Sequence, residues 1–319
     1  MSSAGDRQFG RHSTTAEVLD GLKLDGLQVL ITGGSSGLGA HSARALAAAG
    51  ARVVLTARDR AKGEAVASSI REQTGNAAVE VAELELADLA AVRASAAQLL
   101  ERCPTLDLLI NNAGVMACPQ LQTRDGFELQ FGTNHLGHFL LTGLLAPALL
   151  RAGRARVVNL SSRGHHITGV DLDDPNFERR GYDKWQAYGQ SKTANILFSV
   201  ELERRLGPQG VHAYAVHPGV IQTELMRHLE ASDREMFAER ARRGELPMKS
   251  LAAGCATQVY AATAPELEGR GGVYLEHCQI APVDDESFEH GVRSYAIDAE
   301  RAAKLWALSE RSVGHAWPT

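Results

Sequence analysis

A glycine-rich turn between a short strand and a helix limits most strongly how this 319-residue chain can fold. The apolar run 28–32 (QVLIT) predicts a strand, and the alanine-rich run 40–49 predicts a helix. Between them, Gly33, Gly37 and Gly39 follow the spacing G-x-x-x-G-x-G. Glycines let the backbone approach a phosphate group closely, and the free N–H groups at a helix N-terminus attract anions. The stretch therefore predicts a phosphate-binding unit, with an ordinary Gly/Ser turn as the alternative.

Strands and helices alternate along the whole chain. Seven short apolar runs predict strands, at residues 28–32, 52–57, 78–86, 106–111, 155–162, 211–219 and 271–276. Helical runs lie between them and no hairpin signal joins two strands, so the pattern predicts βαβ units and a buried parallel sheet. We expect one α/β domain over residues 26–319. It follows an N-terminal arm over residues 1–25, with a short helix around 15–21.

Tyr188 and Lys192 lie four residues apart in a run that predicts a helix. Positions i and i+4 share one face of a helix, so the ammonium lies one turn from the phenol. A nearby positive charge stabilises the phenolate and lowers the pKa of the phenol, which is about 10 when unperturbed. Such a tyrosine can exchange a proton near neutral pH. The alternative is a solvated helix face without a chemical role.

The end of the second predicted strand indicates which nucleotide the glycine turn serves. In dinucleotide-binding α/β folds, an acidic residue here binds the ribose 2′-hydroxyl of NAD, whereas an arginine accommodates the 2′-phosphate of NADP. The strand 52–57 ends with Ala57 and is followed by Arg58. The guanidinium and the missing acid favour NADP(H) over NAD(H). The alternative is that Arg58 is only a surface charge at the start of the helix 59–74.

Further motifs follow the glycine turn in a characteristic order. They are residues 32–39 (TGGSSGLG), 111–114 (NNAG), Asn134, Ser161-Ser162, 188–192 (YGQSK) and 217–219 (HPG). In these residues the chain resembles the short-chain dehydrogenase/reductase family, over roughly residues 26–290. The runs 133–139 (TNHLGHF), 182–198 and 302–310 are similar to the branch that contains retinol dehydrogenases and the WW-domain oxidoreductase, in its catalytic module only. The resemblance implies a Rossmann fold with a doubly wound, seven-stranded parallel sheet flanked by helices.

The resemblance also implies a catalytic site of four residues. Tyr188 would exchange a proton with the substrate oxygen, and Ser162 would hydrogen-bond the same oxygen, with Ser161 as the alternative serine. Lys192 would lower the tyrosine pKa and hold the nicotinamide ribose. Asn134 would hold a water molecule in a proton relay with Lys192, unless it only interrupts a helix. These roles imply an NADP-dependent oxidoreductase acting on CH–OH groups.

The same resemblance implies where the cofactor binds. The pyrophosphate and adenosine would contact Gly33, Ser35, Ser36, Gly37, Leu38, Gly39, Arg58, Glu85 and Leu86. The part nearer the nicotinamide would contact Asn112, Ala113, Gly114, Tyr188, Lys192, Pro218, Gly219, Val220 and Thr223. Glu85 stands where the family often has aspartate, so the side chain at this adenine contact is longer than usual.

Composition limits the partners. The net charge is −5, so nothing indicates a nucleic acid or an anionic membrane as partner. The four cysteines lack metal-binding spacing, and the adjacent His165 and His166 would point to opposite sides of an extended backbone, so we expect no metal site. Residues 1–25 contain no apolar targeting run, and the most apolar window, 136–150, is too short to span a bilayer. We expect a cytoplasmic protein without a membrane anchor.

Two segments are expected to enclose the substrate, at residues 165–185 and about 221–250. The second carries Leu225, Met226, Leu229, Met236 and Phe237 among charged residues. Near-helical spacing of these apolar residues predicts an amphipathic lid, or else an ordinary surface helix. A lid of this kind favours a small lipophilic alcohol, ketone or aldehyde as substrate. Two other functions remain open: reduction of a carbon–carbon double bond, and a non-catalytic NADP-binding regulatory role.

The predicted helices 125–150 and 188–206 are apolar over wide faces. In the family, such helices pair with their copies in a neighbouring subunit, so the resemblance implies a homodimer or homotetramer. Alternatively, the C-terminal run 302–310 covers these faces.

Overall fold

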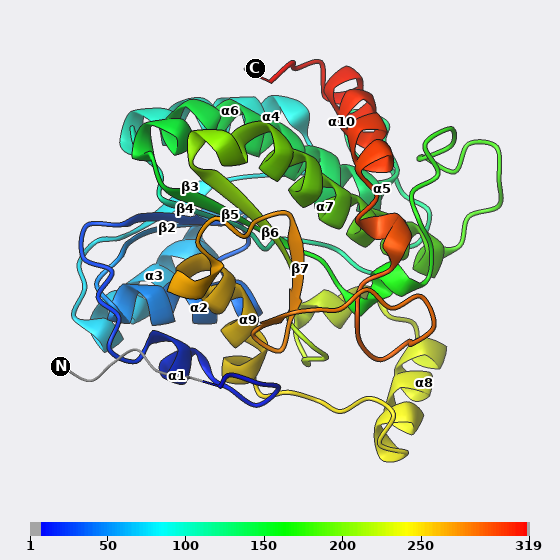
Figure 1. Ribbon diagram of the computed structural model, residues 1–319, viewed down its shortest axis with the longest axis horizontal. Helices are drawn as coiled ribbons and strands as arrows, with labels where there is room; N and C mark the ends of the chain where they lie inside the picture. Colours follow the sequence, from blue (N-terminus) through cyan, green and yellow to red (C-terminus); the bar gives the residue numbers. More distant parts are fainter. Residues whose placement is uncertain (1–7, 318–319) are drawn as a thin grey trace.

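The computed structural model describes residues 8–317 and has a central sheet between two layers of helices (Figure 1). Over the described residues the strands are β1 (Gln28–Ile31), β2 (Arg52–Ala57), β3 (Val79–Glu83), β4 (Leu108–Asn111), β5 (Ala155–Leu160), β6 (Val211–His217), β7 (Val273–Glu276) and β8 (Gln279–Ile280). Their spatial order is β3-β2-β1-β4-β5-β6-β7-β8, and all neighbours pair in parallel except β7 and β8. The predicted doubly wound α/β fold is confirmed, with eight strands rather than seven.

The additional strand β8 follows a tight turn that the sequence does not signal. Glu276 pairs with Gln279, which leaves His277 and Cys278 as the two turn residues. Both have positive φ, 55° and 58°, as the commonest two-residue hairpin turns require. Asn-Gly or Asp-Gly usually marks such a turn, so a His-Cys dipeptide gives no warning of a hairpin.

The winding direction of the sheet reverses between β1 and β4. Strands β2 and β3 extend the sheet on one side of β1, and β4 to β8 extend it on the other. In open α/β sheets, ligands bind beyond the carboxyl ends of the strands at such a reversal. The glycine turn follows β1 and the motif 112–114 follows β4, so both lie at this position.

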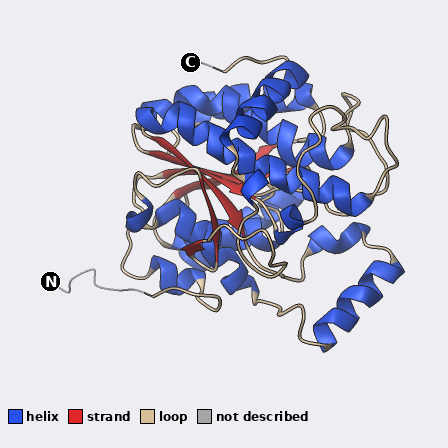
Figure 2. Ribbon diagram, turned by 45° about the vertical axis from the view of Figure 1, so that its right-hand side comes forward, coloured by secondary structure: helices blue, strands red, loops and turns tan. Residues whose placement is uncertain are grey.

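Helices cover both faces of the sheet (Figure 2). On one face lie α1 (Thr15–Leu19), α2 (Gly37–Ala48), α3 (Arg60–Thr74) and α9 (Leu251–Thr263). On the other lie α4 (Leu89–Arg102), α6 (Gly137–Ala152), α7 (Lys184–Leu206) and α10 (Ala299–Val313). Side chains of β1 alternate between the two layers, because Val29 and Ile31 pack on the first and Leu30 on the second.

The helical region predicted over 125–150 consists of three pieces. The short helix α5 (Leu129–Phe131) leads into a π-helical turn, η1 (Gly132–Leu136), which continues into α6. Asn134 lies at the centre of the π turn and is fully buried. Such turns are rare and frequent at functional sites. The regular α-helical winding is therefore interrupted at the position of Asn134.

Residues 8–25 pack against the helix layer that contains α9. A capping box between Thr14 and Glu17 begins α1. Val18 is buried beneath this helix, and the Phe9 ring lies edge-on to Tyr260 of α9, with ring centroids 5.6 Å apart. Residues 1–7 of the predicted arm lie outside the described residues.

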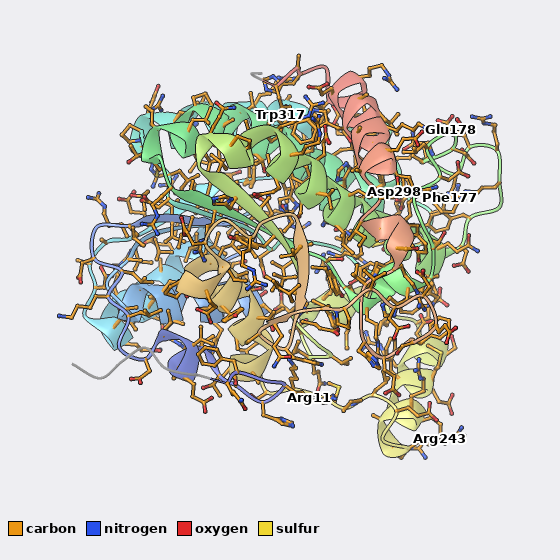
Figure 3. The ribbon with its side chains drawn as sticks, viewed as in Figure 1. Arg11, Phe177, Glu178, Arg243, Asp298 and Trp317 are labelled. Atoms are coloured by element: carbon orange, nitrogen blue, oxygen red, sulfur yellow. The ribbon has the colours of Figure 1, made fainter. Side chains whose placement is uncertain are left out.

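The C-terminal segment covers the outer faces of α6 and α7. In Figure 3, Trp317 lies near the C-terminal end of the chain, between α6 and α10. Trp306 and Trp317 are buried with ring centroids 4.5 Å apart, and both contact Phe139 of α6 and Phe198 of α7. A Cβ at Gly143 of α6 would come within 2.7 Å of the Trp317 indole, so glycine makes room for this ring. The C-terminal segment therefore covers these helix faces, which was the alternative to pairing with a neighbouring subunit.

Candidate active site

Two depressions meet beyond the carboxyl ends of β1, β4 and β5. The first is a cleft of about 720 Å³ over the glycine turn, and the second is a pocket of about 700 Å³ beside Tyr188. Leu38, Asn112, Gly114 and Leu225 line both. A ligand that fills the cleft therefore reaches the pocket at these four residues.

Most of the predicted cofactor contacts line one of these depressions. In the cleft lie Gly33, Ser35, Ser36, Gly37, Leu38, Arg58, Glu85, Leu86, Asn112, Ala113, Gly114 and Thr223. In the pocket lie Tyr188, Lys192, Pro218, Gly219 and Val220. Gly39 is not among the lining residues of either. A Cβ at Gly39 would collide with the carbonyl oxygen of Gly33, so this glycine lets α2 approach the turn.

The N-terminus of α2 is open toward the cleft. Ser36 is the N-cap residue, but its side chain accepts no hydrogen bond from the first turn. The backbone at Gly33 and Gly37 has φ of 67° and 52°, a region that glycine adopts without strain. The Ser36 side chain therefore leaves the first N–H groups of α2 without a cap, and the glycines of the turn place no side chain between these groups and the cleft. This arrangement fits a pyrophosphate group.

Thr32 and His138 hold the two strand-end motifs together, a role that the sequence did not reveal. The Thr32 hydroxyl accepts hydrogen bonds from the backbone N–H groups of Asn112 (2.9 Å) and Ala113 (3.0 Å). It also lies 2.8 Å from Nε2 of His138, whose Nδ1 lies 3.0 Å from the Asn134 carbonyl oxygen. Burial lowers the pKa of His138 to about 4, so the ring is neutral and its Nε2 can accept a hydrogen bond from the Thr32 hydroxyl. Thr32 lies in the motif 32–39 and His138 in the run 133–139, and this was the only indication of their role that the sequence analysis contained.

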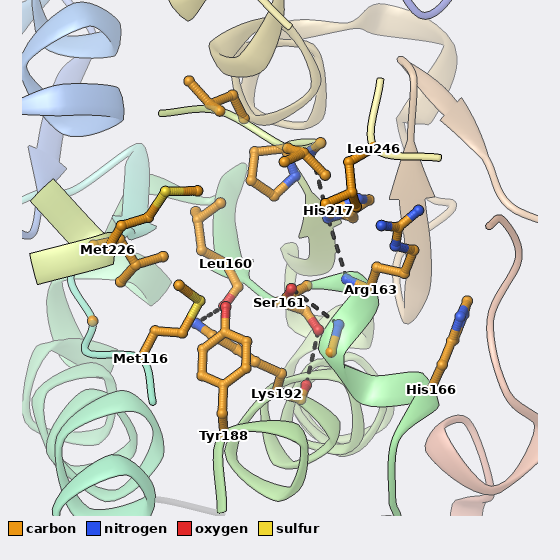
Figure 4. A pocket seen from close by; sticks show the side chains of 18 of the residues that line it. Met116, Leu160, Ser161, Arg163, His166, Tyr188, Lys192, His217, Met226 and Leu246 are labelled. Carbon is orange, nitrogen blue, oxygen red and sulfur yellow. Dashed lines mark hydrogen bonds between the residues drawn. The ribbon is translucent and has the colours of Figure 1, made fainter. Parts of the chain in front are cut away.

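Tyr188 and Lys192 are buried and line the pocket together (Figure 4). The half-buried Ser162 lines the same pocket. Burial raises the pKa of the Tyr188 phenol to about 12, and a hydrogen bond with Ser162 offsets part of this rise. Burial lowers the pKa of Lys192 to about 8. The Lys192 ammonium donates to the Leu160 carbonyl oxygen at 3.0 Å and lies 5.7 Å from the centre of the Tyr188 ring. Because burial dominates, the expected lowering of the tyrosine pKa by Lys192 is not found.

The two neighbouring serines point to different partners. The Ser161 hydroxyl is buried and donates to the carbonyl oxygen of Lys192 at 2.9 Å. The Ser162 hydroxyl accepts from the Gly164 N–H at 3.0 Å and contacts the Tyr188 phenol. Both serines line the pocket, but Ser162 is the one whose hydroxyl contacts the phenol oxygen.

Asn134 acts on the backbone around the site. Its amide oxygen accepts from the Val115 N–H at 2.8 Å, and its amide nitrogen donates to the Val115 carbonyl at 2.9 Å. The same nitrogen donates to Ser191 Oγ at 2.9 Å, and Ser191 donates to the Tyr188 carbonyl at 2.8 Å. These bonds connect the strand end after β4 to the helix that carries Tyr188. The water relay between Asn134 and Lys192 stays a prediction.

The far end of the cleft carries cations and carboxylates in pairs. Arg58, which is mostly exposed, lies 4.0 Å from the Glu85 carboxylate. Lys62 of α3 reaches across to Glu224 at 3.1 Å, and Glu224 belongs to the short turn η4 (Glu224–His228). Arg227 of the same turn also lines this end. Three cations, Arg58, Lys62 and Arg227, therefore stand among three carboxylates, of Asp59, Glu85 and Glu224, where the sequence predicts the adenosine ribose.

The segment 221–250 forms the outer wall of the pocket. It contains η4 and α8 (Ala231–Arg242), and Leu225, Met226, Met236 and Phe237 line the pocket. Phe237 packs against Trp185 of α7 with ring centroids 5.7 Å apart. Lys184 of α7 donates to Asp233 of α8 at 2.7 Å. The apolar face of this segment is thus turned toward the pocket, as an amphipathic lid requires.

Among residues 8–317, no group of three or more His, Cys, Asp and Glu side chains is arranged to hold a metal ion. His165 and His166 are occupied in the fold: His165 Nδ1 lies 2.8 Å from the Ser162 carbonyl oxygen, and His166 Nε2 lies 3.0 Å from that of Gly291. Within the same range, no helix is both long and apolar enough to cross a membrane.

Comparison with known proteins agrees with this geometry. Residues 28–234 match the family model described as short chain dehydrogenase. The chain is 42% identical to human retinol dehydrogenase 13 over 295 residues, which cover 91% of this chain and 86% of that protein.

Solved structures give the same result. A crystal structure of an uncharacterised protein from Mycobacterium paratuberculosis superposes with a TM-score of 0.73 and 38% identity, covering 97% of this chain and 100% of that one. A short chain dehydrogenase from Burkholderia cenocepacia in complex with NADP has a TM-score of 0.63 and 28% identity, covering 79% and 96%.

Fold, motifs and relatives together indicate an oxidoreductase that moves hydride between a nicotinamide cofactor and an alcohol or carbonyl group. The chain belongs to the short-chain dehydrogenase/reductase family, in its retinol dehydrogenase-like branch.

Proposed function

We propose that this protein is an NADP-dependent oxidoreductase that interconverts a carbonyl group and a primary or secondary alcohol on a small lipophilic molecule. The observation that carries the proposal is that Tyr188, Ser162 and Lys192 line one pocket, which adjoins the cleft. The wall around it is apolar, with Met116, Leu160, Trp185, Met226, Phe237 and Leu246 among its residues. An apolar wall with a few convergent polar groups suits a lipophilic substrate.

The nicotinamide, when bound, donates or accepts the hydride. In the direction of reduction, Tyr188 donates its phenolic proton to the carbonyl oxygen as that oxygen gains negative charge. Ser162 donates a hydrogen bond to the same oxygen and orients it. The Lys192 ammonium stabilises the phenolate that Tyr188 becomes, and oxidation runs through the same groups in reverse.

Replacement of Tyr188 by Phe tests the catalytic assignment. Y188F should lower kcat by at least 100-fold, because general acid–base catalysis contributes about 10²- to 10⁴-fold. NADPH binding should stay close to that of the wild type, since the phenol oxygen is the atom removed. S162A should also lose activity, and S161A is its matched control. Full turnover by Y188F, or equal losses in the two serine variants, would refute the assignment.

Arg58 supports the preference for NADP. The β2 strand ends without an acid, and Arg58, Lys62 and Arg227 line the cleft at this end. R58A should raise the dissociation constant of NADPH roughly 10- to 100-fold, because a charge-assisted contact to phosphate is lost. NADH binding should change little, and R52A, an exposed arginine at the other end of β2, is the control. Equal effects of R58A on both cofactors would contradict the role of Arg58.

Product analysis separates this function from the two alternatives. Reduction of a carbon–carbon double bond would leave the carbonyl group intact, and a regulatory protein would bind NADPH without turnover. The presence of Ser162, Tyr188 and Lys192 together supports carbonyl chemistry over double-bond reduction and over a regulatory role.

A further inference from the structure

Arg163 is a charged residue of the pocket that the proposed chemistry does not use. It begins the 3-10 turn η2 (Arg163–His166), directly after Ser162. Its backbone N–H donates to His217 Nδ1 at 3.3 Å, and the next N–H, of Gly164, donates to Ser162 Oγ. In Figure 4 its side chain lies near His217 and Leu246, on the other side of Ser161 from Tyr188. The backbone thus fixes where this guanidinium enters the pocket.

The Arg163 guanidinium is half-buried and has no partner. Over residues 8–317, no acceptor takes a hydrogen bond from it and no carboxylate lies within ion-pair distance. Two other arginines are paired: the buried Arg156 lies 3.1 Å from Glu268, and the half-buried Arg180 lies 3.3 Å from Asp171. A guanidinium offers five N–H donors in a planar fork that matches a carboxylate. Arg163 therefore presents unused donors to the pocket.

A second cation faces the same space. Arg240 of α8 lines the pocket, and after burial its charge is the main cause that lowers the pKa of Arg163. The Nε atom of Arg240 contacts Glu245 at 3.4 Å, where both side chains are about half exposed. The charge of Glu289 raises the pKa of Arg163, but its carboxylate lies beyond ion-pair distance. Two guanidinium groups that face one pocket repel each other, and an anion between them would relieve this repulsion.

Apart from Lys192, two serines and two histidines, the rest of the pocket is largely apolar. Around Tyr188, the wall includes Met116, Met226, Leu160 and Trp185. Arg163 and Arg240 therefore add two cations to a pocket that is otherwise largely apolar outside the reactive groups.

We propose that the substrate combines an apolar body with a carboxylate or similar anionic group, which Arg163 binds as a fork with Arg240 in support. The apolar body would place the reacting carbonyl or alcohol beside Tyr188. This inference rests on the proposed function, because it defines the substrate class of the same site.

Ligand binding without turnover tests the inference. Decanoate, decanol and decylamine serve as probes of equal chain length, with the full-length protein saturated with NADP⁺. Trp185 lines the pocket whereas Trp306 and Trp317 are buried under the C-terminal segment, so tryptophan fluorescence reports probe binding. Decanoate should bind roughly 10- to 100-fold more tightly than decanol, and decylamine should bind most weakly.

The variants assign the effect to the guanidinium. R163Q should bring decanoate affinity down to that of decanol and leave decanol binding unchanged. R163K should recover only part of the loss, because an ammonium cannot form the planar fork. R311Q, which removes an exposed arginine of α10, is the matched control. Equal binding of decanoate and decanol to the wild type, equal weakening of both by R163Q, or no binding of either probe would overturn the inference.

Turnover measurements distinguish failure of the anionic-substrate inference from failure of the proposed function. Medium-chain oxo acids should be reduced with higher kcat/KM than their methyl esters, and R163Q should remove the difference. If acids and esters react equally well, the proposed function stands and the anionic substrate does not. If neither oxidises NADPH while decanoate still binds through Arg163, the proposed carbonyl chemistry is at fault instead.

Discussion

At the scale of single residues, the site separates two ionisable groups that lie one helical turn apart. Burial raises the pKa of Tyr188 to about 12 and lowers that of Lys192 to about 8. The phenol therefore stays protonated through the neutral range and can donate its proton to a carbonyl oxygen. The lysine is the group of the pair that changes charge near pH 8, so it should govern how reduction responds to pH.

The rate of carbonyl reduction should fall as the pH rises above about 8. Below this pH the Lys192 ammonium stabilises the phenolate that proton donation leaves behind, and above it the stabilisation is lost. With one group titrating, kcat/KM should fall about tenfold per pH unit on the alkaline side. Tyr188, with a pKa of about 12, adds no loss in this range. Initial rates of NADPH oxidation between pH 6 and 10 measure the profile.

The arginine variant at the same position provides the control. K192R keeps its charge throughout this range, so its lower activity should no longer decline between pH 8 and 10. A wild-type profile that stays flat up to pH 10, or an unchanged decline in K192R, would show that Lys192 is not the controlling group.

At the scale of secondary-structure elements, the sequence predicted those parts that depend on local pattern. The buried strands β1 to β7 are short apolar runs bounded by helices, and parallel pairing leaves few other arrangements for them. The glycine turn and the strand-end motifs then had to meet at the winding reversal. For this reason the predicted contacts fall into one cleft and one adjoining pocket.

Elements that depend on tertiary contacts were missed. A π turn has nearly the same apolar pattern as an α-helix, so the sequence allowed an interruption at Asn134 but did not indicate a π turn. Strand β8 depends on positive φ at His277 and Cys278, which their side chains do not favour. The contact between Thr32 and His138 joins residues 106 positions apart. The Tyr188 pKa also depends on burial, which i and i+4 spacing does not reveal.

At the scale of the whole molecule, the C-terminal segment occupies the surface that the family resemblance assigned to a neighbouring subunit. Helix α10 packs along α7, and Trp317 lies against Phe139 of α6 and Phe198 of α7. A face that is already buried within one chain is not available to a second copy. We therefore expect a monomer of about 34 kDa by light scattering rather than the predicted dimer or tetramer.

Removal of the last tryptophan side chain tests this cover. W317A should lower the free energy of unfolding by about 3 kcal/mol, the lower end of the range for loss of a buried indole. It should also promote self-association, because Phe139 and Phe198 lose their cover. Urea unfolding and light scattering measure the two effects, and W185A, at a half-buried ring of the pocket wall, is the control for stability. A wild-type dimer that W317A leaves unchanged in mass and stability would contradict the assignment.

The turn η4 takes part in both depressions at once. Glu224 reaches Lys62 across the cleft at 3.1 Å, and the next residue, Leu225, lines both cleft and pocket. A cofactor phosphate that bound Lys62 would compete with Glu224, and it would then act on the turn that carries Leu225 into the pocket wall. Because coupling between two binding equilibria is reciprocal, the factor by which one ligand changes the affinity for the other is the same in both directions. If η4 couples the two sites, the nucleotide bound at one end of the cleft would also affect how tightly the pocket holds its substrate.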